Sequence, residues 1–96
     1  MKTTFNPAKR DWTLSHRGLD LAVDADKVFS GDTVTVVDDR FDYGEVRQIS
    51  AGFLGRRMVV IVWTSRGTGR HIISMRYCHG KEEKRWRKML RQTIDR

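Results

Sequence analysis

The chain of 96 residues is long enough for one small core, and its 39% hydrophobic residues exclude a disordered chain. A single cysteine, Cys78, excludes an internal disulfide framework, and the longest apolar run, Met58–Trp63, is too short to span a membrane. The first residues contain no apolar signal segment, so we expect one domain over residues 1–96 that works in the cytoplasm, away from membranes.

Positive charge is concentrated in the second half of the chain. The 19 Lys and Arg residues exceed the 12 Asp and Glu residues, which gives a net charge of +7. Residues 1–48 contain 7 basic and 9 acidic residues, whereas residues 49–96 contain 12 basic and 3 acidic ones. A half this basic attracts polyanions, and nucleic acid is the common polyanion of the cytosol. The alternative is a basic surface that only keeps the protein soluble.

The first thirty residues predict two helices. Asn6-Pro7 is typical of a helix start, because the Asn side chain caps free amides and Pro fits the first turn. This helix should end near Gly18. Asp20 then caps a second helix, in which apolar residues recur at helical spacing as far as Phe29.

Four strands joined by short turns are predicted next. The first is β-branched throughout, and the third is the most strand-like segment of the chain. Short connections favour antiparallel pairing between neighbours. The predicted strands cover residues 33–37, 44–54, 57–64 and 71–77.

The last segment, Lys81–Arg96, predicts a third helix. Its apolar residues from Trp86 to Ile94 form one stripe on a basic cylinder. The predicted fold class is therefore α+β, with two N-terminal helices, a four-stranded antiparallel sheet and a C-terminal helix. We expect the helices to cover one sheet face and to leave the other face free. Lys84 and Arg87 on the last helix either contact RNA phosphates or only face solvent.

Alternation along the strands places charged residues on the sheet. Glu45 and Arg47 share one face of the second predicted strand. On the last strand, the pattern predicts Arg70 and Arg76 on one face and His71 on the opposite face. Such residues at one end of a sheet favour a shallow site for an anionic ligand. Ordinary cross-strand salt bridges are the alternative.

These residue types fit RNA cleavage without a metal ion. In this reaction the 2′-OH attacks the adjacent phosphate, and it needs a base, an acid and cations that stabilise the transition state. Glu45 and His71 are the candidate bases, and guanidinium groups such as those of Arg47, Arg66 and Arg76 suit the phosphate. His71 and His16 are also candidate acids.

Other chemistries have weaker support in the sequence. The three histidines, His16, His71 and His79, are scattered and show no zinc-ligand spacing with Cys78. The loop at residues 66–69 lacks the Lys-Ser/Thr of a phosphate-binding loop and is typical of a hairpin turn. We therefore predict no metal or other cofactor. A non-catalytic RNA- or DNA-binding module and a purely structural protein are the alternatives to an enzyme.

Short motifs follow one another along the chain at fitting spacings. They are Phe5-Asn6-Pro7-Ala8-Lys9, Arg17-Gly18-Leu19-Asp20, Val28-Phe29, Asp39-Arg40, Tyr43-Gly44-Glu45-Val46-Arg47, Arg57 to Thr64, Arg66-Gly67 and Arg70 to Arg76. In this order they resemble the BrnT family of toxins from bacterial type II toxin–antitoxin modules. The similarity extends from Phe5 to about Trp86.

The resemblance implies a ribonuclease toxin with a RelE-like fold that cleaves RNA and stops translation. It also implies neutralisation by a BrnA-type antitoxin, with operator DNA bound only through that antitoxin. The charged motif positions of the family fall on Lys9, Glu45, Arg47, Arg66 and Arg76. Taken together, the predicted catalytic residues are Glu45, Arg47, His71 and Arg76, and the predicted RNA-binding residues are Lys9, His16, Arg66, Arg70, Lys84 and Arg87.

Overall fold

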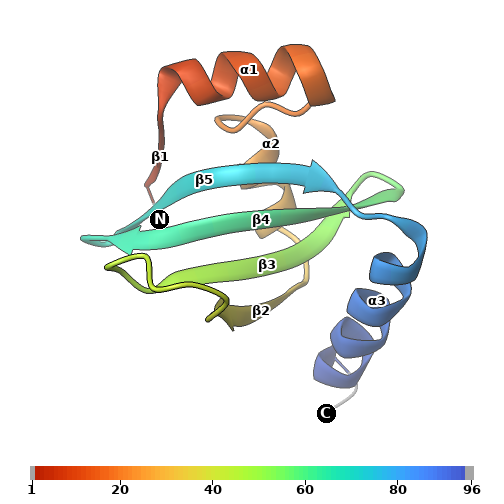
Figure 1. Cartoon of the computed structure of the whole chain (residues 1–96). Helices are drawn as coiled ribbons and strands as arrows, with labels where there is room; N and C mark the ends of the chain where they lie inside the picture. Colours follow the sequence, from red (N-terminus) through yellow and green to blue (C-terminus); the bar gives the residue numbers. More distant parts are fainter. Residues whose placement is uncertain (1, 95–96) are drawn as a thin grey trace.

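The computed structural model describes residues 2–94 as a sheet with three helices (Figure 1). The predicted α+β class is confirmed. No helix in this part of the chain is long and apolar enough to cross a membrane. The elements are β1 (Thr3–Phe5), α1 (Pro7–Arg17), α2 (Asp24–Phe29), β2 (Thr33–Asp38), β3 (Arg47–Leu54), β4 (Arg57–Arg66), β5 (Gly69–Tyr77) and α3 (Gly80–Ile94).

The sheet has five strands in the order β1-β5-β4-β3-β2, so the prediction of four strands was one short. Strands β2 to β5 form the predicted antiparallel meander, whereas β1 pairs with β5 in parallel. The amide of Arg70 donates to the carbonyl of Lys2 at 2.8 Å. Gly69 permits this approach, because a Cβ there would collide with the Lys2 backbone. The sequence did not predict β1, because a strand of three residues is too short to show an alternating pattern of side chains.

The two N-terminal helices are present, but the second is shorter than predicted. The side chain of Asn6 accepts a hydrogen bond from the Lys9 amide at 3.1 Å, and Gly18 ends α1 with a φ of 69°. Asp20 accepts hydrogen bonds from the amide of Ala22 and from Arg10. It therefore fixes a turn before α2, where a helix cap had been predicted.

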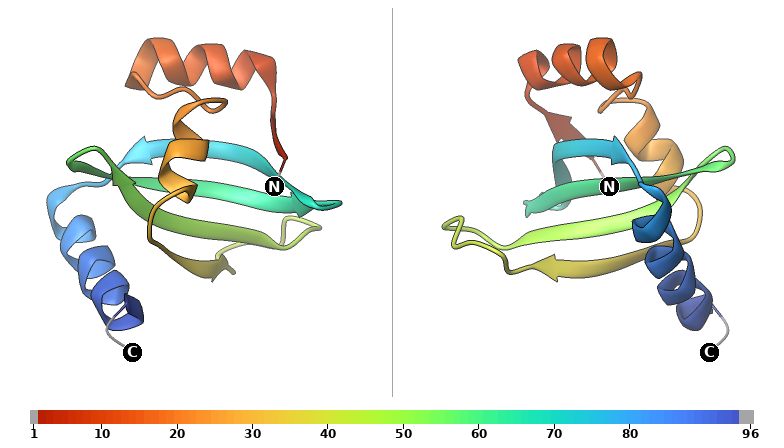
Figure 2. Two further views of the ribbon diagram at one scale, coloured as in Figure 1. Left: turned by 180° about the vertical axis from the view of Figure 1, so that it is seen from behind. Right: turned by 45° about the vertical axis from the view of Figure 1, so that its right-hand side comes forward.

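Helices cover both faces of the sheet, so the expectation of one free face was wrong. Helix α2 lies on one face and α3 on the other, as the views in Figure 2 show. Strand β4 explains this arrangement, because its residues from Met58 to Ile61 are all buried and both of its faces need apolar cover. On the α2 side, Leu21 and Val28 pack with Val59, Ile61 and Met75.

The second core lies under α3 at one end of the sheet. Leu90 is buried there with Val34, Ala51, Met58 and Val60, and Trp86 packs against this cluster. The helix follows β5 and covers the end of the sheet where the β3–β4 turn lies (Figure 1). The opposite end of the same face, which holds the start of β3 and of β5, lies beyond α3.

Candidate functional site

A β-bulge in β5 determines which charged residues share the face that α3 partly covers. Val62 pairs with Ser74, but the next residue, Trp63, pairs with Ile72, so Ile73 is an extra residue in β5. Residues on the two sides of the bulge therefore alternate out of phase.

Because of the bulge, the charged side chains of β5 do not lie on the sheet faces that the sequence pattern predicts. Arg70 lies on the α2 side, where its guanidinium carbon is 3.9 Å from the centre of the Phe29 ring. Arg76 lies on the α3 side, where it contacts Glu82. His71 alternates with the buried Ile72 of the α2 side, and so it shares the α3 face with Arg76. The sequence pattern had placed Arg70 with Arg76 and His71 opposite them.

The part of this face next to α3 forms a hollow of about 200 Å³ with an apolar floor and a charged rim. We call this hollow the groove. The floor comes from β3 and β4, and the rim comes from β5, α3 and the loop between β2 and β3. Its lining residues are Arg40, Ile49, Val60, Val62, Ser74, Arg76, Glu82 and Trp86.

Arg76 is held on the rim by a carboxylate from α3. Its two terminal nitrogens donate to the two carboxylate oxygens of Glu82, each at 2.6 Å. This pair raises the pKa of Arg76 and lowers the pKa of Glu82, in each case mainly through the side-chain hydrogen bonds. The Arg76 side chain remains 38% exposed, so an anion in the groove can reach it.

Arg40 reaches the groove from the loop after β2. Its guanidinium donates to both oxygens of Asp38 at 2.8 and 2.9 Å, and the Tyr43 hydroxyl donates to the same carboxylate at 3.1 Å. The hydrogen bonds from Arg40 are the largest cause that lowers the pKa of Asp38 to about 2. The Asp38 side chain is buried, but that of Arg40 is 62% exposed, so its charge faces solvent.

Four predicted residues gather at the end of the sheet away from α3. Arg47 donates to Glu45 at 3.4 Å and stacks on Tyr43, with its guanidinium carbon 4.0 Å from the ring centre. Burial lowers the pKa of His71, the positive charge of Arg66 lowers it further, and Glu45 opposes the change. These surroundings therefore favour the neutral imidazole of His71. Its Nδ1 shares a hydrogen bond with the Thr4 hydroxyl at 2.9 Å.

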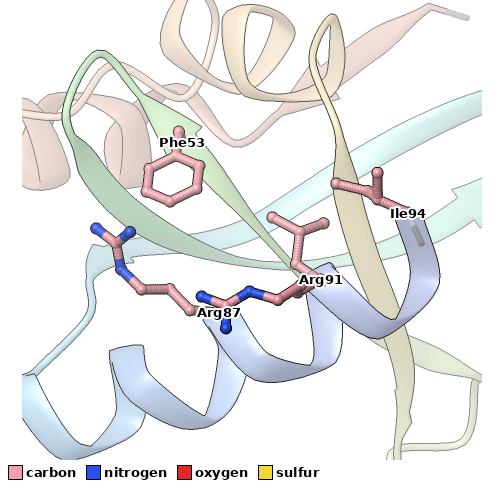
Figure 3. A pocket seen from close by; sticks show the side chains of 5 residues that line it. Phe53, Arg87, Arg91 and Ile94 are labelled. Atoms are coloured by element: carbon pink, nitrogen blue, oxygen red, sulfur yellow. The ribbon is translucent and has the colours of Figure 1, made fainter.

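The remaining predicted residues lie apart from the groove. Lys9 and His16 belong to α1, where both contact the ring of Trp12. Lys84 and Arg87 belong to α3. Arg87 pairs with Glu83 and lies over Phe53, at a second hollow between α3 and β3 that Figure 3 shows.

Sequence reasoning missed two residues of the rim, Arg40 and Glu82. Arg40 lies in a turn, and strand alternation gives no information about turns. Glu82 lies in the first turn of α3, where an acidic residue is also explained by the positive end of the helix dipole. Only the packing of α3 across the sheet brings Glu82 to Arg76.

The single cysteine lies in surroundings that disfavour its reactive thiolate form. Burial raises the pKa of the Cys78 thiol to about 11, so its thiolate is scarce at pH 7. Within residues 2–94, no three His, Cys, Asp or Glu side chains lie close enough together to hold a metal ion.

Guanidinium groups, which suit anions such as phosphates, thus line the sheet face that α3 partly covers. Comparison with known families is more specific. Residues 5–82 match the family described as "Ribonuclease toxin, BrnT, of type II toxin-antitoxin system", and the chain belongs to this family. The family implies an RNA substrate and an antitoxin protein as partner. No curated protein matches the chain.

Proposed function

We propose that this toxin cleaves RNA without a metal ion, by attack of a 2′-OH on the adjacent phosphate. The observation that carries the proposal is the gathering of guanidinium groups and a histidine on one sheet face. Arg40 and Arg76 are on the rim of the groove, and Arg47 and His71 are at the far end of the same face.

The groove would hold the RNA backbone. His71 lies opposite Thr64 and Arg76 lies opposite Val60, and four residues of β4 span roughly 13 Å at 3.3 Å per residue. A strand of RNA with one phosphate between Arg40 and Arg76 would therefore reach His71 with a nucleotide further along the strand. Arg76 must exchange the carboxylate of Glu82 for that phosphate, which has a similar geometry.

The chemistry would take place at the His71 end. The neutral imidazole takes the proton of the 2′-OH, and the oxygen of this hydroxyl attacks phosphorus. The guanidinium groups of Arg47 and Arg66 stabilise the negative charge that develops on the phosphate and on the departing 5′-oxygen. Glu45 keeps Arg47 in place through their ion pair. The 5′-oxygen takes a proton from water, so the products end in a 2′,3′-cyclic phosphate and a 5′-OH.

The cellular function follows from this reaction and from the family. We propose that RNA cleavage in the cytoplasm stops translation, and that a BrnA-type antitoxin neutralises the toxin. Operator DNA would be bound only through that antitoxin. The basic charge of residues 49–96 favours the approach to RNA.

Incubation of a defined RNA with the purified protein in excess EDTA tests the proposal. We expect fragments that end in 2′,3′-cyclic phosphate, and loss of cleavage in a folded His71→Ala variant. Cleavage that needs added Mg²⁺ would contradict the metal-free reaction. RNA that is bound but stays intact would favour the alternative, a binding module without catalysis.

A further inference from the structure

The loop between β2 and β3 exposes an aromatic ring beside the groove. Phe41 is 69% exposed, more than any other large hydrophobic side chain in residues 2–94. Nothing in the proposed cleavage reaction uses it. An exposed aromatic ring offers a flat apolar face that a ligand can contact.

The loop holds this ring in a defined position. Arg40 and Tyr43 both donate to the buried carboxylate of Asp38, and the amide of Gly44 donates to Asp42 at 3.0 Å. Gly44 has a φ of 72°, which side chains disfavour and which closes the turn. Phe41 therefore projects from a hydrogen-bonded turn.

Phe41 continues a line of flat groups that starts at the sheet. Arg47 lies over Tyr43, and the Tyr43 and Phe41 rings form an edge-to-face pair, at 74° with 5.9 Å between the ring centres. The guanidinium group of Arg47 covers the Tyr43 ring, whereas the Phe41 ring is exposed to solvent. The preceding residue, Arg40, lines the groove.

The charges around Phe41 select which part of an RNA it can contact. Asp39 and Asp42 lie on either side of the ring in the sequence, so a phosphate is repelled at the tip of the loop. The guanidinium groups of Arg40, Arg47 and Arg76 attract the backbone to the sheet face. A nucleobase is neutral and flat, and aromatic rings beside a basic track bind unpaired bases by stacking.

We propose that Phe41 is a stacking platform for an unpaired base of an RNA whose backbone lies in the groove. The inference rests on the proposed function, and it adds that the substrate is single-stranded at this position. In a duplex the bases are stacked on one another, so their faces are not free to cover Phe41.

The test measures binding of a 2′-O-methyl oligonucleotide, which cannot be cleaved because it has no 2′-OH. Its affinity is compared as a single strand and as a duplex, for the wild type, Phe41→Ala, Phe41→Trp and Val46→Ala. The last variant is a control, because Val46 is an apolar residue of the same loop that is 67% exposed.

We expect Phe41→Ala to weaken single-strand binding by roughly tenfold, with unchanged duplex binding. The dependence on salt should not change, because no charge is removed. Phe41→Trp should keep the affinity, and its fluorescence should be quenched on binding. Val46→Ala should behave as the wild type.

Three results would overturn the inference. They are no single-strand binding by the wild type, equal losses for single strand and duplex, and a Phe41→Ala variant that binds the single strand as the wild type does. Cleavage of an unmodified RNA separates the two proposals. If Phe41→Ala weakens RNA binding but the wild type does not cleave RNA, only the proposed reaction is refuted. If Phe41→Ala binds and cleaves RNA as the wild type does, only the role of Phe41 as a stacking platform is refuted.

Discussion

Arg76 and Glu82 form a two-point ion pair across the rim of the groove, with both nitrogen–oxygen distances at 2.6 Å. The pair joins the end of β5 to the first turn of α3. It also places a carboxylate on the guanidinium face that a phosphate would use. In the proposed RNA complex Glu82 therefore has two effects: it stabilises the position of α3, and it competes with RNA for Arg76.

Glu82→Gln separates these two effects. The neutral amide cannot compete with phosphate for Arg76, so RNA affinity should rise several-fold. The slope of log affinity against log salt concentration should become steeper by about one unit. The free energy of unfolding should fall by roughly 1–2 kcal/mol, because a charge-assisted pair is lost. Filter binding and chemical denaturation measure the two quantities. An unchanged RNA affinity would mean that phosphate does not contact Arg76, and Glu83→Gln on the same helix serves as the control.

The pH dependence of cleavage tests His71. Its pKa is lowered from 6.5, mainly by burial, which favours the neutral form that accepts a proton. The rate should be constant around neutrality and should fall as the pH drops through this lowered pKa, because the imidazole becomes protonated. Single-turnover rates between pH 4.5 and about 8 give the profile. A rate that increases on acidification would instead show His71 acting as an acid.

Acid stability tests the Asp38 cluster. The pKa of Asp38 is about 2 in the folded protein against 3.8 in its ordinary state, so its contribution is complete above about pH 4. It is lost as the pH falls towards 2. Asp38→Asn should lower the free energy of unfolding by about 2 kcal/mol at pH 7, and the difference should disappear near pH 2. Urea titrations at several pH values measure this, with the exposed Asp39→Asn as control; equal effects of the two substitutions would contradict the account.

The close backbone approach at Gly69 tests the fifth strand. In Gly69→Ala the new methyl group meets the Lys2 backbone, which cannot move without breaking the pairing of β1 with β5. We expect a loss of about 1–3 kcal/mol and faster amide exchange at Arg70, whose amide donates to Lys2. Gly80→Ala, where a Cβ meets open space, is the matched control. Unchanged exchange at Arg70 would show that β1 is not docked as described.

Local sequence patterns predicted most helices and strands, whereas tertiary packing determined which sheet face each side chain of the site shares. The Asn6 cap, the Gly18 stop and the meander of β2 to β5 are local features, and each is present. The bulge at Ile73 is not visible in the apolar pattern, and it reverses the predicted faces of His71 and Arg70. A single inserted residue has this effect because side chains alternate with a period of two.

The site was predicted only in part for the same reason. Arg47 and Arg76 were expected on the sheet, and both lie on the face that α3 partly covers. Arg40 and Glu82 complete the rim, and they come from a turn and a helix, to which the alternation of strands does not apply. Their positions depend on how the turn folds around Asp38 and on where α3 packs, and neither is a repeating pattern.

The most direct test of the groove as the RNA site compares two variants of equal charge. The first is Arg40→Gln with Arg76→Gln, which removes both guanidinium groups of the rim. The second is Arg56→Gln with Arg91→Gln, which removes two exposed guanidinium groups outside the groove. Cleavage of one RNA at fixed salt should fall at least roughly a hundredfold in the first variant, since each lost phosphate contact costs transition-state binding. It should fall only slightly in the second, and equal losses in both would contradict the assignment of the groove.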